Sequence, residues 1–178
     1  MTDIATRLIT LAIDRNHSLL EFAVKHMKFT TVKGRFEDFS GTILFDPDDI
    51  ERSSVDVTID TASLNTGIGA RDTHLRSADF FDVKRFPIAT FHSTSIEGDR
   101  TRFTIDGELT IRDVTRPISL RAEYQGSGVN PSGVEVSGFE ATGRFNRRDF
   151  GLNWNQALES GGVLVSDEVR LDLDIQAH

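Results

Sequence analysis

The sequence contains no cysteine in its 178 residues. Disulfide bridges, thiolate nucleophiles and zinc–thiolate sites are therefore excluded, and the composition is compatible with a reducing compartment. Positive charge is also scarce, because 20 Lys and Arg stand against 28 Asp and Glu and give a formal net charge of −8. Such a chain repels phosphate backbones overall, so we do not expect general binding of nucleic acid.

Long apolar runs are missing as well. No stretch approaches the roughly 18 apolar residues of a membrane-spanning helix. The run from Leu8 to Ile13 is too short for a secretory signal, is interrupted by Thr10, and is not followed by a small-x-small cleavage site. We therefore expect a cytoplasmic protein. The length fits a single domain over residues 1–178, which is large enough to bury a core.

Aromatic residues with a polar group are rare, since the chain has one Tyr and one Trp against thirteen Phe. A buried Tyr or Trp usually needs a hydrogen-bond partner, whereas Phe suits a surface that must stay wholly apolar. Such a surface is either a packed core or an apolar cavity. Composition alone leaves both readings open.

Most of the chain alternates between apolar and polar residues, which is the period of half-buried strands. Turn sequences separate these segments, including Asp46-Pro47-Asp48-Asp49 and the Gly- and Ser-rich residues 125–133, read here as a loop. The apolar parity changes near Ser40-Gly41, which indicates a turn or bulge, and across Gly138, which indicates a bulge. The segments are residues 20–24, 32–36, 39–45, 55–59, 103–111, 118–124, 134–145 and 169–175.

This pattern, without any βαβ unit, predicts an all-β antiparallel β-barrel of about eight strands whose C-terminal strand pairs with the first. One segment, Arg71–Ser93, breaks the alternation and places charges next to Phe80, Phe81 and Phe86. We predict a short helix over about residues 70–82, near the barrel mouth, in which Asp72 lies near the N-terminus and four residues before Arg76.

Six short motifs follow one another along the chain. They are Ile13-Asp14-Arg15-Asn16-His17-Ser18, Phe22-Ala23-Val24-Lys25-His26, Val32-Lys33-Gly34-Arg35-Phe36, Arg71-Asp72-Thr73-His74-Leu75-Arg76-Ser77 through Phe80-Phe81 with Phe86-Pro87 and Phe91, Gly107-Glu108-Leu109-Thr110-Ile111-Arg112 through Val114-Thr115-Arg116-Pro117, and Asn146-Arg147-Arg148-Asp149-Phe150-Gly151-Leu152 before Trp154. In this order and at these separations they resemble one known family, the YceI-like family of lipocalin-like, polyisoprenoid-binding proteins. The resemblance extends from about Leu11 to Ile175 and departs from the family pattern at Leu11, where Trp is frequent, and at Asp113, where Gly is common.

The resemblance implies a lipocalin-like barrel with an elongated apolar cavity that holds a long isoprenoid or similar lipid tail. No cofactor is required, and a bound isoprenoid or other lipid is the expected occupant. Alternation cannot tell a hollow barrel from one filled by its own side chains. The residues expected on the cavity wall, from alternation and from the matching motifs, are Phe22, Val24, Phe36, Val57, Leu75, Phe80, Phe81, Phe91, Phe103, Leu109, Leu120, Phe145, Phe150 and Trp154.

A polar head group, such as a diphosphate or a quinone, would need hydrogen-bond donors at the rim. The basic residues beside the matching motifs could supply these donors. They could instead have a structural role, because Asp72, Asp79, Asp113 and Asp149 lie close to them in sequence and could hold them in ion pairs. We weigh structural pairing above head-group contact for most of them. The candidates are His26, Arg71, His74, Arg76, Arg112, Asn146 and Arg147.

Two other functions remain open. One is an enzyme at the barrel mouth with His26 or His74 as acid–base and Asp72 or Asp149 as its partner, although no catalytic motif is found. The other is a filled barrel whose loops contact a protein. The five histidines lack ligand-like spacing, so we expect no metal site. An exposed rim with several Phe side chains would favour a homodimer.

Overall fold

The computed structural model describes residues 7–178. These residues form eleven strands, one α-helix and four short 3-10 helices. The strands are β1 (Ile9–Ala12), β2 (Leu19–His26), β3 (Thr30–Phe36), β4 (Phe39–Phe45), β5 (Ser54–Asp60), β6 (Leu64–Asn65), β7 (Ile88–Gly98), β8 (Arg102–Ile111), β9 (Val114–Val129), β10 (Glu135–Asn146) and β11 (Glu168–Ala177), and the helices are η1 (Arg15–His17), η2 (Ile50–Arg52), η3 (Thr61–Ser63), α1 (Gly69–Arg76) and η4 (Arg147–Phe150).

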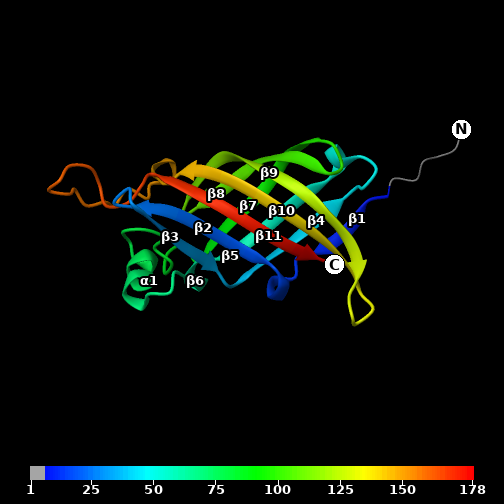
Figure 1. The fold of residues 1–178 in the computed structure, drawn as a ribbon, viewed down its shortest axis with the longest axis horizontal. Coiled ribbons are helices and arrows are strands. Elements are labelled where there is room, and N and C mark those ends of the chain that lie inside the picture. Colours follow the sequence, from blue (N-terminus) through cyan, green and yellow to red (C-terminus); the bar gives the residue numbers. More distant parts are fainter. Residues whose placement is uncertain (1–6) are drawn as a thin grey trace, which may run out of the picture.

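All eleven strands belong to one antiparallel sheet that curls around an apolar interior (Figure 1). The strand order is β1-β4-β5-β7-β8-β9-β10-β11-β2-β3-β6. The predicted all-β class is confirmed, and so is the pairing of the last strand with the first predicted one, since β11 pairs with β2. The end of the N-terminal strand joins distant parts of the sheet, because Ile13 donates to the Gly41 carbonyl and also forms a bridge with Ala177.

The predicted count of about eight strands was wrong. Two of the additional strands, β1 and β6, are only four and two residues long, too short for a periodic pattern. The third, β7, is long, but its apolar alternation fails at Ser93, which is buried and accepts a hydrogen bond from the Val55 amide. A bulge follows between Ser93 and Ser95 and reverses the parity.

Two turn predictions also need correction. Residues 125–133 are mostly strand, because β9 continues to Val129 and pairs with β10 despite its Gly and Ser content. The parity change placed near Ser40-Gly41 instead falls at the turn of residues 37–38, which separates β3 from β4. The bulge predicted at Gly138 is present, with Gln125 of β9 as the additional residue opposite it.

Helix α1 is shorter than predicted. It ends at Arg76, where the Ser77 amide donates to the His74 carbonyl from an extended backbone, and turns follow as far as residue 85. Asp72 does not pair with Arg76. Its carboxylate accepts hydrogen bonds from the Thr66 amide and hydroxyl, at 2.9 and 2.5 Å, so it fastens the helix to the preceding loop.

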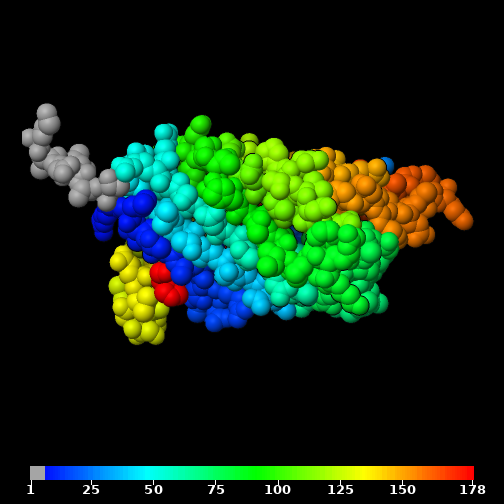
Figure 2. Space-filling view, turned by 180° about the vertical axis from the view of Figure 1, so that it is seen from behind, coloured from blue at the N-terminus to red at the C-terminus, as the bar shows by residue number. Residues whose placement is uncertain are grey.

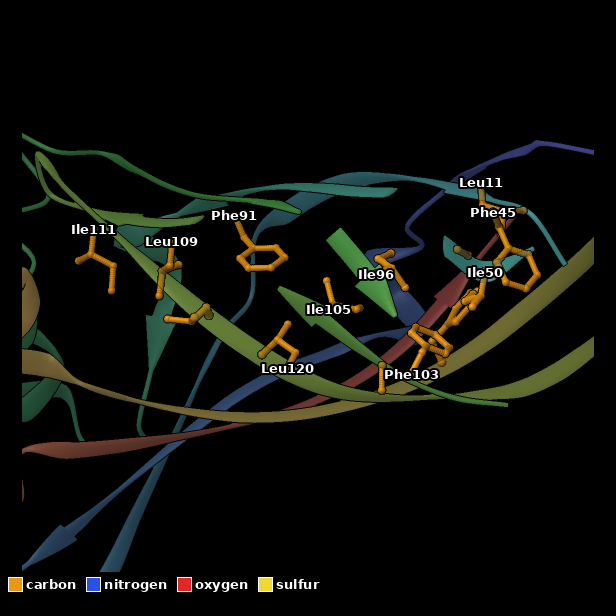
Figure 3. Packing of buried hydrophobic residues seen from close by; sticks show 14 of the residues in the cluster. Leu11, Phe45, Ile50, Phe91, Ile96, Phe103, Ile105, Leu109, Ile111 and Leu120 are labelled. Atoms are coloured by element: carbon orange, nitrogen blue, oxygen red, sulfur yellow. The ribbon is translucent and has the colours of Figure 1, made fainter. Parts of the chain in front are cut away.

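The apolar faces of the strands meet inside the curled sheet. Figure 3 shows labelled side chains of this interior pointing from the surrounding strands toward one another. Its buried members are Leu11, Phe45, Ile50, Phe91, Ile96, Phe103, Ile105, Leu109, Ile111, Ile118, Leu120, Ala122, Phe139, Phe150, Leu152 and Ala177. Within residues 7–178, no helix is long and apolar enough to cross a membrane.

Candidate functional site

The interior of the sheet contains an elongated cavity of about 370 Å³ whose wall is almost entirely apolar. Every strand from β2 to β11 except β6 contributes to it, and α1 and the loop after η4 complete it. This volume lies within the usual range of roughly 300–1,000 Å³ for small-molecule sites. The protein interior is therefore hollow enough to admit an apolar guest.

Most residues expected on an apolar wall lie along this cavity. Phe150 is the exception, since it is fully buried behind the wall and packs against Phe145, with ring centroids 5.2 Å apart. That these side chains contact a ligand stays a prediction. The residues on the wall are Phe22, Val24, Phe36, Val57, Leu75, Phe80, Phe81, Phe91, Phe103, Leu109, Leu120, Phe145 and Trp154.

The wall also contains residues that were not among the expected cavity residues. Many of them continue the same alternation, which could have identified them, whereas Leu164 and Val165 lie in a loop and give no periodic signal. Glycine has a separate role on this wall. The tip of the Phe91 ring lies so close to Gly107 of β8 that a Cβ there would overlap it. The alternating residues include Ile43, Phe45, Ile105, Ile111, Ile118, Phe139, Val169, Leu171, Leu173 and Ile175.

Trp154, His74 and Phe80 form an aromatic cluster at one end of the cavity. The His74 ring meets the Trp154 ring edge-on, with centroids 4.6 Å apart, and the Phe80 ring at 5.2 Å. Its Nε2 atom lies 2.8 Å from the Asp79 carboxylate. The partners considered for an acid–base role, Asp72 and Asp149, are therefore not the carboxylates that His74 contacts.

Arg147 lines the cavity, but its guanidinium donates its hydrogen bonds to backbone carbonyls of the protein. Only 3% of the residue is exposed. Its guanidinium donates to the carbonyls of Leu152 and Trp154, at 2.5 and 2.9 Å, and to those of Ser166 and Val165, at 2.9 and 3.4 Å. Burial lowers the pKa of Arg147 from its ordinary value, with the nearby Asp167 opposing that effect. This arginine fixes the loop of residues 151–166 over the cavity end.

Arg71 and His26 also reach the cavity. The Arg71 guanidinium donates to the hydroxyl and carbonyl oxygens of Thr66, both at 2.7 Å, and so stabilises the start of α1. His26 ends β2 and forms a bridge with Val165. Its imidazole makes no hydrogen bond with any other residue of the described part of the chain, which leaves it as a polar group available at this end.

Three of the predicted rim residues lie away from the cavity wall. Arg76 donates to the carbonyls of Ala62 and Leu64, at 2.9 and 2.8 Å. Arg112 sits in the β8–β9 turn with its guanidinium over the Phe86 ring. Asn146 caps η4 by accepting from the Arg148 amide. Arg71, Arg76 and Arg147 thus bond to backbone carbonyls and to the Thr66 hydroxyl, and not to the acids near them in sequence.

A second hollow lies on the outer face of the sheet, across β3, β2, β11, β10 and β9, with a volume of about 720 Å³. Charged side chains dominate it, so it does not suit an apolar guest. Within residues 7–178, no group of three or more His, Asp or Glu side chains could hold a metal ion. The charged residues of the outer hollow are Glu21, Lys33, Arg121, Arg144, Arg170 and Asp172.

Comparison with known proteins identifies the fold. A family model described as the YceI-like domain matches residues 11–177. The chain belongs to the YceI-like family. One YceI-like relative, Protein YceI of Salmonella newport, is 40% identical over 136 residues, which cover 76% of this chain and 71% of that protein.

Two solved structures share this YceI-like architecture. BcnA of Burkholderia cenocepacia superposes with a TM-score of 0.82 at 24% identity, over 93% of this chain and 99% of that one. A domain from Saccharophagus degradans superposes with a TM-score of 0.66 at 18% identity, over 97% and 99% of the two chains. That domain is described as polyisoprenoid-binding and as implicated in plant cell wall breakdown. At these identities the likeness concerns the fold.

Proposed function

We propose that this YceI-like protein binds a long-chain amphiphile, such as a polyisoprenoid or an isoprenoid quinone, with its apolar tail inside the curled sheet, for carriage, storage or sequestration. The observation that carries the proposal is the elongated cavity with its nearly continuous apolar wall. The description of the Saccharophagus degradans domain as polyisoprenoid-binding supports the same ligand class.

Burial of the tail supplies enough free energy for binding. Each enclosed CH₂ group contributes about 0.8 kcal/mol, so a segment of about ten carbons gains on the order of 8 kcal/mol. That gain exceeds the lower estimates, about 4 kcal/mol, of the cost of immobilising a ligand. Specific polar contacts are therefore not needed for affinity, which agrees with the arginines of the cavity wall, Arg71 and Arg147, already donating to Thr66 and to backbone carbonyls.

His26 and His74 are two of the polar side chains on the cavity wall and are candidates to contact a head group. Organic extraction of the purified protein, followed by mass spectrometry, tests the proposal. We expect a stoichiometric amphiphile with a long apolar chain. Protein that yields no such compound, and that takes up none when an isoprenoid alcohol is supplied in detergent, would contradict it.

A further inference from the structure

Large apolar side chains are exposed on three separate loops at one end of the molecule. Phe29, at the tip of the β2–β3 hairpin, is 83% exposed, the highest value among the exposed large hydrophobic residues of the described chain. Ile68, just before α1, is 53% exposed, and Val163, in the loop after η4, is 39% exposed. Figures 1 and 2 place the loop after η4 and helix α1 at this end, opposite the β9–β10 hairpin.

Each of these residues is close in sequence to one that lines the cavity. Phe29 follows His26 by three residues, Ile68 follows Thr66 by two, and Val163 directly precedes Leu164. The exposed apolar groups therefore surround the same end of the cavity at which His26 and Leu164 form its wall. We call this end the mouth face, and it comprises Met27–Phe29, Ile68 and Val163.

Backbone hydrogen bonds hold the tip of the β2–β3 hairpin, although the Phe29 ring is exposed to solvent. Met27 and Lys28 have φ values of 52° and 65°, left-handed conformations that cost a non-glycine residue roughly 1 kcal/mol or more each. The Phe29 amide donates to the His26 carbonyl, and the Met27 amide donates to the Leu164 carbonyl. The backbone thus presents Phe29 to the outside from a braced turn.

Lys28 adds a charge to the apolar tip. Its ammonium forms no ion pair with any residue from 7 to 178. An exposed aromatic ring beside a lysine is the combination typical of side chains that enter the interface of a bilayer, where the ring is buried and the ammonium meets lipid phosphates. At the opposite end, the β9–β10 turn exposes Val129 and Val134 but has neither an aromatic residue nor a cation between them.

We propose that the mouth face docks on the surface of a lipid bilayer, so that the apolar chain passes between bilayer and cavity without crossing water. The inference rests on the proposed function. Crossing water would cost about 0.8 kcal/mol for every CH₂ exposed, which makes direct contact the faster route for a long chain. The net charge of −8 argues against broad electrostatic attachment to anionic lipid and favours a small apolar contact with one local cation.

The test measures exchange of all-trans-retinol, a fluorescent isoprenoid alcohol, between the protein and vesicles made of equal parts phosphatidylcholine and phosphatidylglycerol. Phe29→Asp should slow exchange by about tenfold or more, because it removes the side chain that the bilayer would bury. Val129→Asp, the matched change at the other end, should exchange like the wild type. Both variants should bind retinol supplied in detergent with wild-type affinity.

Exchange by Phe29→Asp at the wild-type rate would overturn the proposal, as would an equal loss in both variants. A Phe29→Asp protein that loses only self-association, measured by sedimentation, would assign the mouth face to a second copy of this chain and also overturn it. Failure of the wild type to bind retinol from detergent would instead contradict the proposed function. Co-flotation of the protein with empty vesicles would then still show whether the mouth face docks on a bilayer.

Discussion

The tip of the Phe22 ring on β2 lies so close to Gly34, its partner on β3, that a Cβ at Gly34 would overlap the ring. The same Cβ would lie 2.8 Å from the Thr66 methyl group. Glycine is therefore needed here for close approach of a ring to the wall, and not for an unusual backbone angle. The absence of a side chain at Gly34 leaves room for the Phe22 ring, which lines the cavity.

Replacement of Gly34 by Ala should force the Phe22 ring away from the wall and into the cavity. We expect a loss of about 1–3 kcal/mol in the free energy of unfolding, as is usual for overpacking, together with weaker ligand binding. Urea denaturation measures the first effect. Gly128→Ala on β9 is the control, because a Cβ at Gly128 would meet no atom of residues 7–178 within 4 Å, and this variant should unfold like the wild type. Equal stability of all three proteins would contradict the role assigned to Gly34.

Arg147 should be essential to the loop over the cavity end. Arg147→Met removes the donors that satisfy the carbonyls of Leu152, Trp154 and Ser166, and each unsatisfied buried acceptor costs about 1–3 kcal/mol. We expect at least about 3 kcal/mol less stability and faster amide hydrogen exchange in residues 151–166. Arg148→Met is the matched control.

Arg148 is half-exposed and pairs with Asp167 at the surface, so its replacement should cost less than about 1 kcal/mol. Hydrogen exchange followed by mass spectrometry distinguishes the two variants. Unchanged protection of residues 151–166 in Arg147→Met would show that the loop is held by other contacts.

Asp72 should anchor helix α1. Asp72→Ala deprives the Thr66 amide and hydroxyl of their acceptor in a buried site, so we expect a loss of about 1–3 kcal/mol. Exchange of backbone amides in residues 66–76 should quicken. Asp79→Ala breaks only the exposed contact with His74 and should cost less than about 1 kcal/mol. Similar effects of the two substitutions would argue against the anchoring role.

His92 should titrate at an unusually high pH for an exposed histidine. Its Nδ1 atom hydrogen-bonds to the carboxylate of Asp56, its partner across β5 and β7, and this bond and the charge of Asp56 raise the pKa of His92. The imidazolium therefore adds stability below the unfolded pKa of about 6.5, and that contribution disappears as pH rises through the higher folded pKa. NMR titration should show the raised value in the wild type and a lower one in Asp56→Asn; identical values would contradict the pairing.

Alternation predicted much of the sheet because side chains on a strand face opposite sides in turn, and Phe22, Phe103 and Leu109 reach the cavity for that reason. The same rule missed β7, where Ser93 occupies an inward position and a bulge reverses the parity. It also could not place the loop residues Leu164 and Val165, whose positions depend on Arg147 and on pairing with His26.

The rim was harder to predict than the wall. Sequence proximity placed Asp72 beside Arg76, but the helix turns Arg76 toward the carbonyls of Ala62 and Leu64 and Asp72 toward Thr66. A carbonyl acceptor belongs to every residue and leaves no mark in a sequence, so such contacts follow only from the tertiary fold.

Trp154, the single tryptophan of the protein, lies on the cavity wall and can report on an apolar chain bound there. The most direct test is fluorescence titration of Trp154 with all-trans-retinol in detergent for the wild type, for Ala141→Phe on the cavity wall and for Thr142→Phe on the outer face of the same strand. We predict saturable binding by the wild type and Thr142→Phe, and binding weakened about tenfold or more in Ala141→Phe because the added ring fills the cavity. Equal binding by all three proteins would contradict the account.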